Sequence, residues 1–144
     1  MRIVWKDNPL PFHPHAMPAA LAARAAHEQG KFWEFHDKVF QNQQKMTHDD
    51  FVGYARQLGL DVSRFEKSFT QGNGKPQIDA DAAEARSLGA TGTPAFFING
   101  KLLSGAQPFN AFADVINAEL TRLKVPVPPA AAAPQAPAAG TGGR

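Results

Sequence analysis

The sequence predicts an α/β or α+β domain with a small sheet and abundant helix, and three observations lead to this fold class. Apolar residues recur with a helical period through residues 18–89, and glycines interrupt the pattern at intervals. A β-branched and aromatic run occupies residues 2–6, and another, residues 93–98, runs into an Asn-Gly pair. The order strand, several helices, strand, strand, helix is typical of layered α/β or α+β domains.

Length and composition limit the possible classes of protein. The 144 residues, of which 43% are hydrophobic, suffice for one domain with a core. A net charge of +2 spreads over the surface and creates no strong field, so nucleic acid is not an expected partner. The longest apolar runs fall short of the roughly 18 residues that cross a membrane, so no membrane insertion is expected. The first residues match neither a signal peptide nor an anchor, and the compartment stays unknown.

The first expected strand and the first two helices follow from simple signals. Residues 2–6 (RIVWK) are predicted to form a strand that ends before a proline-rich loop. Pro18 suits the first turn of a helix that continues to about His27, and Gly30 ends it. A second helix is expected over residues 31–42, with its aromatic residues on one broad side.

Capping residues place three further helices. Thr47 is a good N-cap because its hydroxyl can accept a free backbone N–H of the first turn. Asp61 is predicted to cap the next helix in the same way, and Gly72 to end it. Pro76 begins a fifth helix that is expected to reach Gly89.

The pattern changes after residue 92 from helical to strand-like. Residues 93–98 and 101–104 flank Asn-Gly and therefore predict a hairpin. Apolar spacing predicts a last helix over residues 108–123. Residues 125–144 are rich in alanine, proline and glycine, cannot bury enough surface to offset their ordering entropy, and are predicted to be a disordered tail. The folded body is thus residues 1–124.

Aromatic residues are frequent in the helical part of the chain and are interpreted as its core, because an exposed patch of that size would aggregate. The alternative is that an exposed subset forms a groove for a peptide. The group comprises Phe32, Trp33, Phe35, Phe40, Phe51, Tyr54, Phe65 and Phe69.

Three separated motifs resemble DsbA-like thioredoxin-fold proteins. They are PLPFHPHA at 9–16, EQGKFWEFHDKVF at 28–40, and GTPAFFINGKLLSGAQPF at 92–109. The resemblance extends over about residues 2–123. It implies a thioredoxin-like fold of the DsbA type, incomplete at its N-terminal side, with a small mixed sheet and a helical insertion. Such proteins are usually periplasmic or otherwise extracytoplasmic in bacteria.

The resemblance also implies a peptide-binding turn. The proline of such a turn is generally cis in thioredoxin-like proteins, and the matching residue is Pro94. The backbone of the residue before it pairs with an extended substrate peptide, which makes Gly92, Thr93 and Pro94 the candidate peptide-binding residues. The alternative from the residues alone is an ordinary trans proline that opens an edge strand.

The family acts in thiol-disulfide exchange through a Cys-x-x-Cys pair at the start of a helix. The strand and helix that carry this pair would precede residues 2–6, and the sequence contains no cysteine. The chain is therefore expected to have no catalytic residue and to be redox-inactive as written. The first interpretation is a truncated oxidoreductase that retains the peptide-binding region. The alternative is a non-enzymatic binding or scaffold module that recruits a partner at an exposed sheet edge.

The absent strand of the family lies between the strands that match residues 2–6 and 95–98. Unpaired backbone groups in a buried sheet each cost roughly 1 to 3 kcal/mol, so the gap must be closed. The two remaining strands can pair directly, or another chain can supply a strand, as in a homodimer formed by strand exchange. The third possibility is that the complete form begins further upstream.

Neither a metal site nor a cofactor is expected. His13 and His15 stand close together in the proline-rich loop, but no further ligand is spaced to join them. The glycines of QGNGK at 71–75 lack the preceding strand and the full spacing of a phosphate-binding loop, so a turn between helices is expected there.

Overall fold

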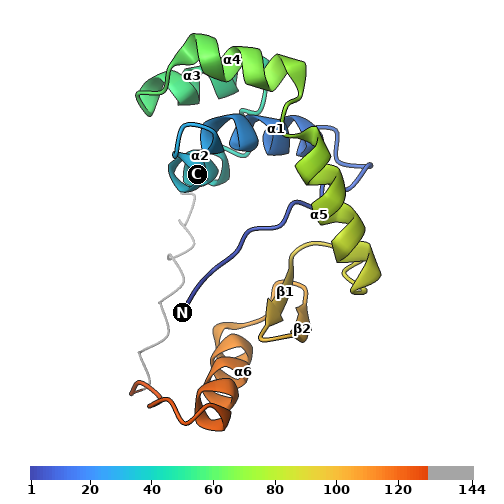
Figure 1. The fold of residues 1–144 in the computed structure, drawn as a ribbon, viewed down its shortest axis with the longest axis vertical. Helices are drawn as coiled ribbons and strands as arrows, with labels where there is room; N and C mark the ends of the chain where they lie inside the picture. The colour runs from blue at the N-terminus through green and yellow to red at the C-terminus, as the bar shows by residue number, and fades with distance from the viewer. Residues whose placement is uncertain (130–144) are drawn as a thin grey trace, which may run out of the picture. The chain divides into compact units, whose positions relative to one another are not determined.

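The computed structural model describes residues 1–129, and they divide into two compact units. The helical unit is Met1–Thr91, and the hairpin unit begins at Gly92 (Figure 1). Helices of the helical unit are α1 (Ala16–His27), α2 (Phe32–Gln41), α3 (His48–Gln57), α4 (Val62–Gln71) and α5 (Lys75–Ser87). The hairpin unit contains β1 (Ala95–Ile98), β2 (Lys101–Ser104) and α6 (Phe109–Arg122).

Helix ends in the helical unit follow the local signals of the sequence. The Thr47 hydroxyl accepts the backbone N–H of Asp50, and the Asp50 carboxylate accepts the backbone N–H of Thr47, a complete capping box for α3. The Asp61 carboxylate accepts the backbone N–H of Arg64 and caps α4 in the same manner. At the other end of α4, Gly72 takes a left-handed conformation with φ +67°, which glycine adopts without steric cost.

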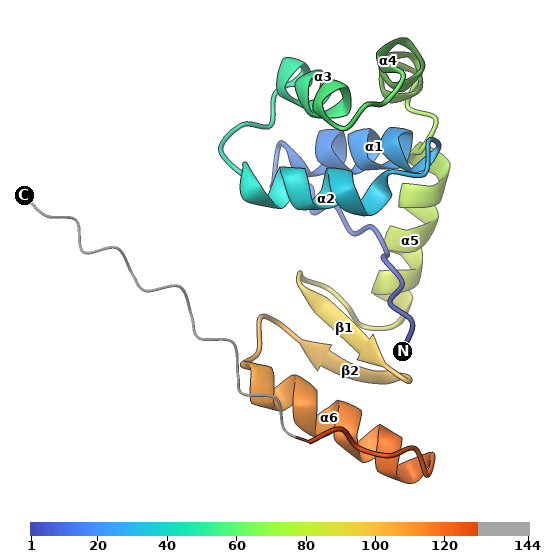
Figure 2. The same cartoon turned by 90° about the vertical axis from the view of Figure 1, so that its left-hand side faces the viewer.

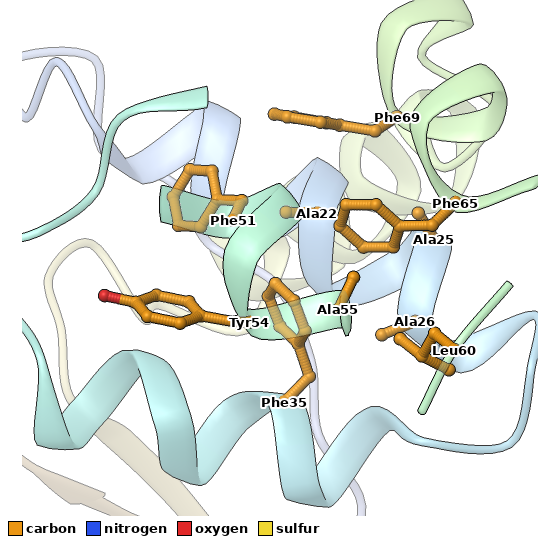
Figure 3. Close-up of a cluster of buried hydrophobic side chains, with 10 residues drawn as sticks. All are labelled: Ala22, Ala25, Ala26, Phe35, Phe51, Tyr54, Ala55, Leu60, Phe65 and Phe69. Carbon is orange, nitrogen blue, oxygen red and sulfur yellow. The ribbon is translucent and has the colours of Figure 1, made fainter. Parts of the chain in front are cut away.

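The core of the helical unit is built from alanines of α1 and aromatic rings of α2, α3 and α4 (Figure 3). Small side chains on α1 allow the neighbouring helices to approach closely, and the rings fill the space between them. The Phe35 ring, which is fully buried, lies 5.5 Å from the Phe65 ring and 6.2 Å from the Phe51 ring, centroid to centroid. The cluster comprises Ala22, Ala25, Ala26, Phe35, Phe51, Tyr54, Ala55, Leu60, Phe65 and Phe69.

Two of the predicted core residues lie on the surface instead. Trp33 is 46% exposed and Phe40 is 55% exposed, whereas the other six members of the predicted aromatic group are buried. Both residues belong to α2 but lie outside the side that faces the core. The Trp5 ring packs against both of them, with centroid separations of 6.4 Å to Trp33 and 6.5 Å to Phe40. The prediction of a single aromatic core is therefore wrong for these two residues.

The predicted strand over residues 2–6 is also wrong. These residues carry no strand assignment, and the described part of the chain contains a single two-stranded sheet, β1 with β2. That sheet is antiparallel and not mixed. A strand, unlike a helix, makes its hydrogen bonds to a neighbour, so a β-prone sequence without a pairing partner does not form one.

A close helix contact fixes the turn between α4 and α5, which is the turn between helices expected for QGNGK. At Gly74, the residue before α5, an added Cβ would lie 2.5 Å from the Cβ of Arg24 on α1. Only a residue without a side chain fits at this distance, so Gly74 permits α5 to begin against α1.

In the hairpin unit, β1 and β2 are joined by Asn99 and Gly100, with φ of +47° and +84°. Positive φ at both positions is the requirement of the tightest hairpin turns, which explains the Asn-Gly pair. The α6 helix lies against the hairpin (Figure 2).

Beyond α6, residues 125–129 have neither helix nor strand. The rest of the predicted tail, 130–144, lies outside the described residues. Among residues 1–129, no helix is both long and apolar enough to cross a membrane.

Candidate functional site

The turn that leads into β1 consists of Gly92, Thr93 and Pro94, the candidate residues from the sequence. All three are exposed, and they lie in neither a helix nor a strand. The peptide bond between Thr93 and Pro94 is cis. Chain continuity alone brings the three residues together, and they stand directly before the first paired residue of the sheet.

The pairing register decides which backbone groups of this region are free. The Gly105 N–H donates to the Pro94 carbonyl at 2.9 Å, so these two residues form a hydrogen-bonded pair. Hydrogen-bonded and non-bonded pairs alternate along an antiparallel ladder. The next bonded pairs are therefore the ones that contain Phe96 and Ile98, whose backbone groups face β2.

The intervening residues, Ala95 and Phe97, direct their backbone N–H and C=O groups to the side of β1 that faces away from β2. We call this row of groups the open edge. Because the sheet has two strands within the described residues, no neighbouring strand of the hairpin unit pairs with the open edge. Unpaired N–H and C=O groups along an exposed strand are a template for another strand.

The two faces of the hairpin differ in their surroundings. On one face, the Phe96 ring meets the Phe112 ring of α6 edge-on, with the centroids 4.8 Å apart. On the other face, Phe97 and Leu102 are paired across the strands and remain 41% and 46% exposed. We call Phe97 and Leu102 the uncovered face. It is apolar and adjoins the open edge through Phe97.

A buried carboxylate holds α6 to the hairpin. Glu119 is 4% exposed and accepts hydrogen bonds from Arg122 at 2.9 Å and from Asn99 at 3.3 Å, while the Lys101 ammonium lies 2.9 Å away. The hydrogen bond from Arg122, together with that from Lys101, lowers the pKa of Glu119 to about 2. The carboxylate is therefore ionised at neutral pH and serves as a structural anchor. Glu119 was not predicted from the sequence, although its spacing of three from Arg122 is a recognisable helix pair.

A second charged cluster, in the helical unit, fixes the chain before α1. The Arg24 guanidinium bridges the carboxylates of Asp7 and Asp81, with N–O distances of 2.6 Å to each. Burial raises the pKa of Asp81, but hydrogen bonds from the Asp7 backbone N–H, Lys6 and Gln77 outweigh it, so that the pKa is lowered. Among the described residues, no buried side-chain polar atom of the cluster lacks a hydrogen-bond partner, as expected of a buried network that stabilises the fold.

The surface beside this cluster contains a hollow of about 470 Å³ lined mainly by apolar and aromatic groups. Trp5 and Phe32 are packed against one another there, with ring centroids 5.9 Å apart. The lining residues are Ile3, Val4, Trp5, Arg24, His27, Gly30, Phe32 and Trp33. Arg24, one of these lining residues, is paired with the carboxylates of Asp7 and Asp81.

His13 and His15, the histidines considered as metal ligands, are both exposed in the loop before α1. Over the described range 1–129, no three His, Cys, Asp or Glu side chains gather closely enough to hold a metal ion.

The fold and the turn define a class of protein. A glycine-threonine-proline turn, an antiparallel hairpin and a closing helix follow a helical unit, which is the C-terminal arrangement of a thioredoxin-like domain. The model of the DSBA-like thioredoxin domain matches residues 9–117. The chain therefore belongs to the DSBA-like thioredoxin domain family, and it contains no cysteine.

Several relatives are much longer proteins. The chain is 37% identical over 127 residues to the Na⁺/H⁺ antiporter NhaA 1 of Salinispora arenicola, which covers 86% of the chain and 20% of that protein. It is 42% identical over 113 residues to NhaA 3 of Salinispora tropica, covering 76% of the chain and 17% of that protein. It is 38% identical over 109 residues to the Na⁺/H⁺ antiporter NhaA of Herminiimonas arsenicoxydans, and this match covers 76% of the chain and 18% of that protein. The chain thus spans about a fifth of the length of these relatives.

Proposed function

We propose that this chain is a peptide-binding DsbA-like thioredoxin domain without redox activity. In this proposal, the turn at Gly92, Thr93 and Pro94 binds an extended polypeptide through the backbone of Thr93. Thiol-disulfide exchange requires a thiolate that attacks a disulfide sulfur, and the chain has none.

The observation that carries the proposal is the state of Thr93. The residue is exposed, it directly precedes the cis bond to Pro94, and among the described residues its backbone N–H and C=O form no hydrogen bond with another backbone group. Backbone groups in this state can bind a peptide by strand addition, in which main-chain hydrogen bonds supply the affinity. Membership of the family supports the same assignment, because the turn matches its peptide-binding region.

The absence of cysteine makes the test direct, because a single introduced cysteine can be labelled at one place. We expect Thr93→Cys, carrying a photoreactive label, to cross-link to a reduced and alkylated unfolded protein. Ser87→Cys, labelled identically at an exposed position of α5, serves as the matched control. Equal yields at the two positions would contradict the proposal.

The unmodified chain should also show no activity in an insulin-reduction assay. Measurable turnover would contradict the proposal that it lacks redox activity. An unlabelled unfolded protein should compete with the cross-link at position 93, whereas the same protein in its folded state should not.

Two origins of such a domain are compatible with the proposal. The first is a truncated oxidoreductase, and the second is a non-enzymatic binding or scaffold module whose sheet edge recruits a partner. The DNA upstream of the codon for Met1 distinguishes them. An upstream in-frame sequence that encodes a β-strand and then Cys-x-x-Cys supports the first origin. The absence of such a sequence supports the second.

A second candidate function is that of an accessory domain attached to a sodium/proton antiporter. Relatives that carry the name NhaA contain a matching region of about a fifth of their length, which favours this candidate. An immunoblot of cells that express the gene should then detect a polypeptide several times larger than 15.5 kDa in the membrane fraction. A single band at 15.5 kDa in the soluble fraction would exclude it.

A further inference from the structure

The described residues contain two Asn-Gly pairs, and both lie in turns. Asn99 and Gly100 join β1 to β2, and Asn73 and Gly74 join α4 to α5. Glycine has no side chain to hinder its backbone nitrogen, which can therefore approach the side-chain amide carbon of the asparagine before it. Such a pair can lose ammonia without an enzyme. Which of the two pairs reacts depends on how tightly the fold holds each turn.

The turn at Asn99 and Gly100 is open to solvent. Both residues are exposed, and among residues 1–129 the Gly100 N–H donates to no backbone acceptor. No atom lies within 4 Å of the place where a Cβ of Gly100 would stand. Hydroxide can therefore reach this N–H and remove its proton. The nitrogen can turn towards the Asn99 side chain once the Ile98–Lys101 pair at the end of the ladder has opened, and ladder ends open readily.

The turn at Asn73 and Gly74 is held by the helices around it. The Asn73 N–H donates to the Ser68 carbonyl at 3.1 Å. Gly74 lies so near α1 that an added Cβ would stand 2.5 Å from the Cβ of Arg24. A rotation of the Gly74 nitrogen towards the Asn73 side chain would move the start of α5 against α1. This pair is therefore expected to react only when the helical unit opens.

The Asn99 side chain also contributes to the contact between the hairpin and α6. Its Nδ2 donates to Oε2 of Glu119 at 3.3 Å. Aspartate in its place would remove this donor, but Asp-Gly also suits the tightest hairpin turns, and the cations Lys101 and Arg122 lie beside Glu119. Isoaspartate instead carries the main chain through the former side chain. It adds a carbon atom to the turn, so that both the two-residue turn and the hydrogen bond to Glu119 are lost.

We infer that Asn99 is a site of spontaneous deamidation, and that its isoaspartate product releases the hairpin from α6. The deprotonated Gly100 nitrogen bonds to Cγ of Asn99, and the bond from Cγ to Nδ2 breaks, so that Nδ2 leaves as ammonia. The product is a five-membered cyclic imide. Water then adds to one of its two carbonyl carbons, and the bond from that carbon to the Gly100 nitrogen breaks, so that this nitrogen regains a proton.

The place at which water adds decides the product. Addition at Cγ gives aspartate, and addition at the backbone carbonyl carbon of residue 99 gives isoaspartate. The inference requires no peptide at the turn before β1, so it is independent of the proposed function.

Incubation of the full chain in mildly alkaline buffer tests the site. Proteolysis and mass spectrometry then follow conversion at each asparagine, because replacement of the amide nitrogen by oxygen changes the peptide mass. We expect Asn99 to convert at least about tenfold faster than Asn73 in the folded chain. In concentrated urea the two pairs should convert at similar rates, because the fold no longer distinguishes them. Similar rates in the folded chain, or faster conversion of Asn73, would overturn the inference.

A variant identifies the product and its origin. Asn99→Gly retains a residue pair that suits the tight turn but has no side-chain amide. An enzyme that methylates isoaspartate should label the aged unmodified chain within the β1–β2 turn and should leave this turn of aged Asn99→Gly unlabelled. Absence of label from the turn of the aged unmodified chain would contradict the inference.

Amide exchange tests the structural consequence. Chromatography separates the aged chain into its aspartate and isoaspartate forms, and the Phe96 amide, which is bonded to β2, reports on the hairpin. We expect this amide to exchange about tenfold faster or more in the isoaspartate form. Freshly prepared Asn99→Asp, the control for the change in charge, should differ from the unmodified chain by less than that. The Ala25 amide of the helical core should exchange equally in all forms. Unchanged protection of Phe96 in the isoaspartate form would show that the hairpin is not released.

Discussion

At Gly74 the backbone of the α4–α5 turn passes so near α1 that a methyl group would collide with Arg24, 2.5 Å from its Cβ. We expect Gly74→Ala to lower the free energy of unfolding by about 1 to 3 kcal/mol, because either α1 or α5 must shift. Urea unfolding measures the change. Gly53→Ala is the control, since Gly53 lies inside α3 with no atom within 4 Å of the added carbon. That variant should gain about 0.5 to 1 kcal/mol.

Arg24 also holds two buried carboxylates, and its removal would leave them without their shared counter-charge. We expect Arg24→Met to lower the free energy of unfolding by about 3 to 5 kcal/mol, the usual cost of breaking a buried ion pair from one side. Lys75→Met, which removes an exposed ion pair with Asp79, should change it by less than about 1 kcal/mol. Similar losses in the two variants would show that burial of the cluster is not the cause.

Residues that depend on distant partners were beyond prediction from the sequence. Asp7 and Asp81 are 74 positions apart, and no local sequence motif indicates that the two residues meet in the fold. The position of the turn at residues 92–94 could be predicted because its motif is contiguous, whereas peptide binding there stays a prediction. The direction of the Ala95 backbone groups could not be predicted, because it depends on the register with β2 and not on the residue type.

Helices were predicted well because their ends are encoded locally. The N-caps Thr47 and Asp61 and the stop at Gly72 act within one turn of the helices that they delimit. The segment at residues 2–6 has equally clear β-branched and aromatic residues, yet it forms no strand. Strand formation needs a neighbour, and the sequence pattern reports only the propensity of the segment itself.

The capping box of α3 can be tested by itself. We expect Thr47→Ala to lower the free energy of unfolding by about 1 kcal/mol, because the backbone N–H of Asp50 loses its acceptor. Thr47→Ser retains the hydroxyl and should stay within about 0.5 kcal/mol of the unmodified chain. Thermal or urea unfolding of the three proteins provides the comparison, and equal losses for both variants would rule out the cap as the reason.

The α6–hairpin contact should depend on pH through Glu119. Its pKa is lowered from 4.5 to about 2 in the folded chain, so folding favours the ionised carboxylate. The stabilisation is therefore fully present above about pH 4.5 and is lost as the pH falls through about 2. In the unmodified chain, the opening free energy of the hairpin should therefore fall between about pH 4.5 and about pH 2. We expect this fall to be smaller in Glu119→Gln, as measured by amide exchange of β1. Asp114→Asn, an exposed carboxylate of α6, controls for the change in net charge, and an identical flattening there would refute the assignment.

Across the whole chain, the two units differ in how they obtain stability. The helical unit encloses a cluster of aromatic rings and alanines, and its charged groups are paired. The hairpin unit depends on one edge-on aromatic contact and on the anchor at Glu119, within its described residues. The hairpin unit is therefore expected to be the less stable of the two units.

This imbalance predicts that the two units open separately. Native-state amide exchange should give Phe96 and Ile98, which are bonded within the hairpin, an opening free energy about 2 kcal/mol or more below that of Ala25 and Phe65 in the helical core. The reason is that opening the hairpin exposes little apolar surface, whereas opening α1 or α4 exposes the aromatic cluster. Equal opening free energies would instead mean that both units unfold in one cooperative step, and the prediction of separate opening would be wrong.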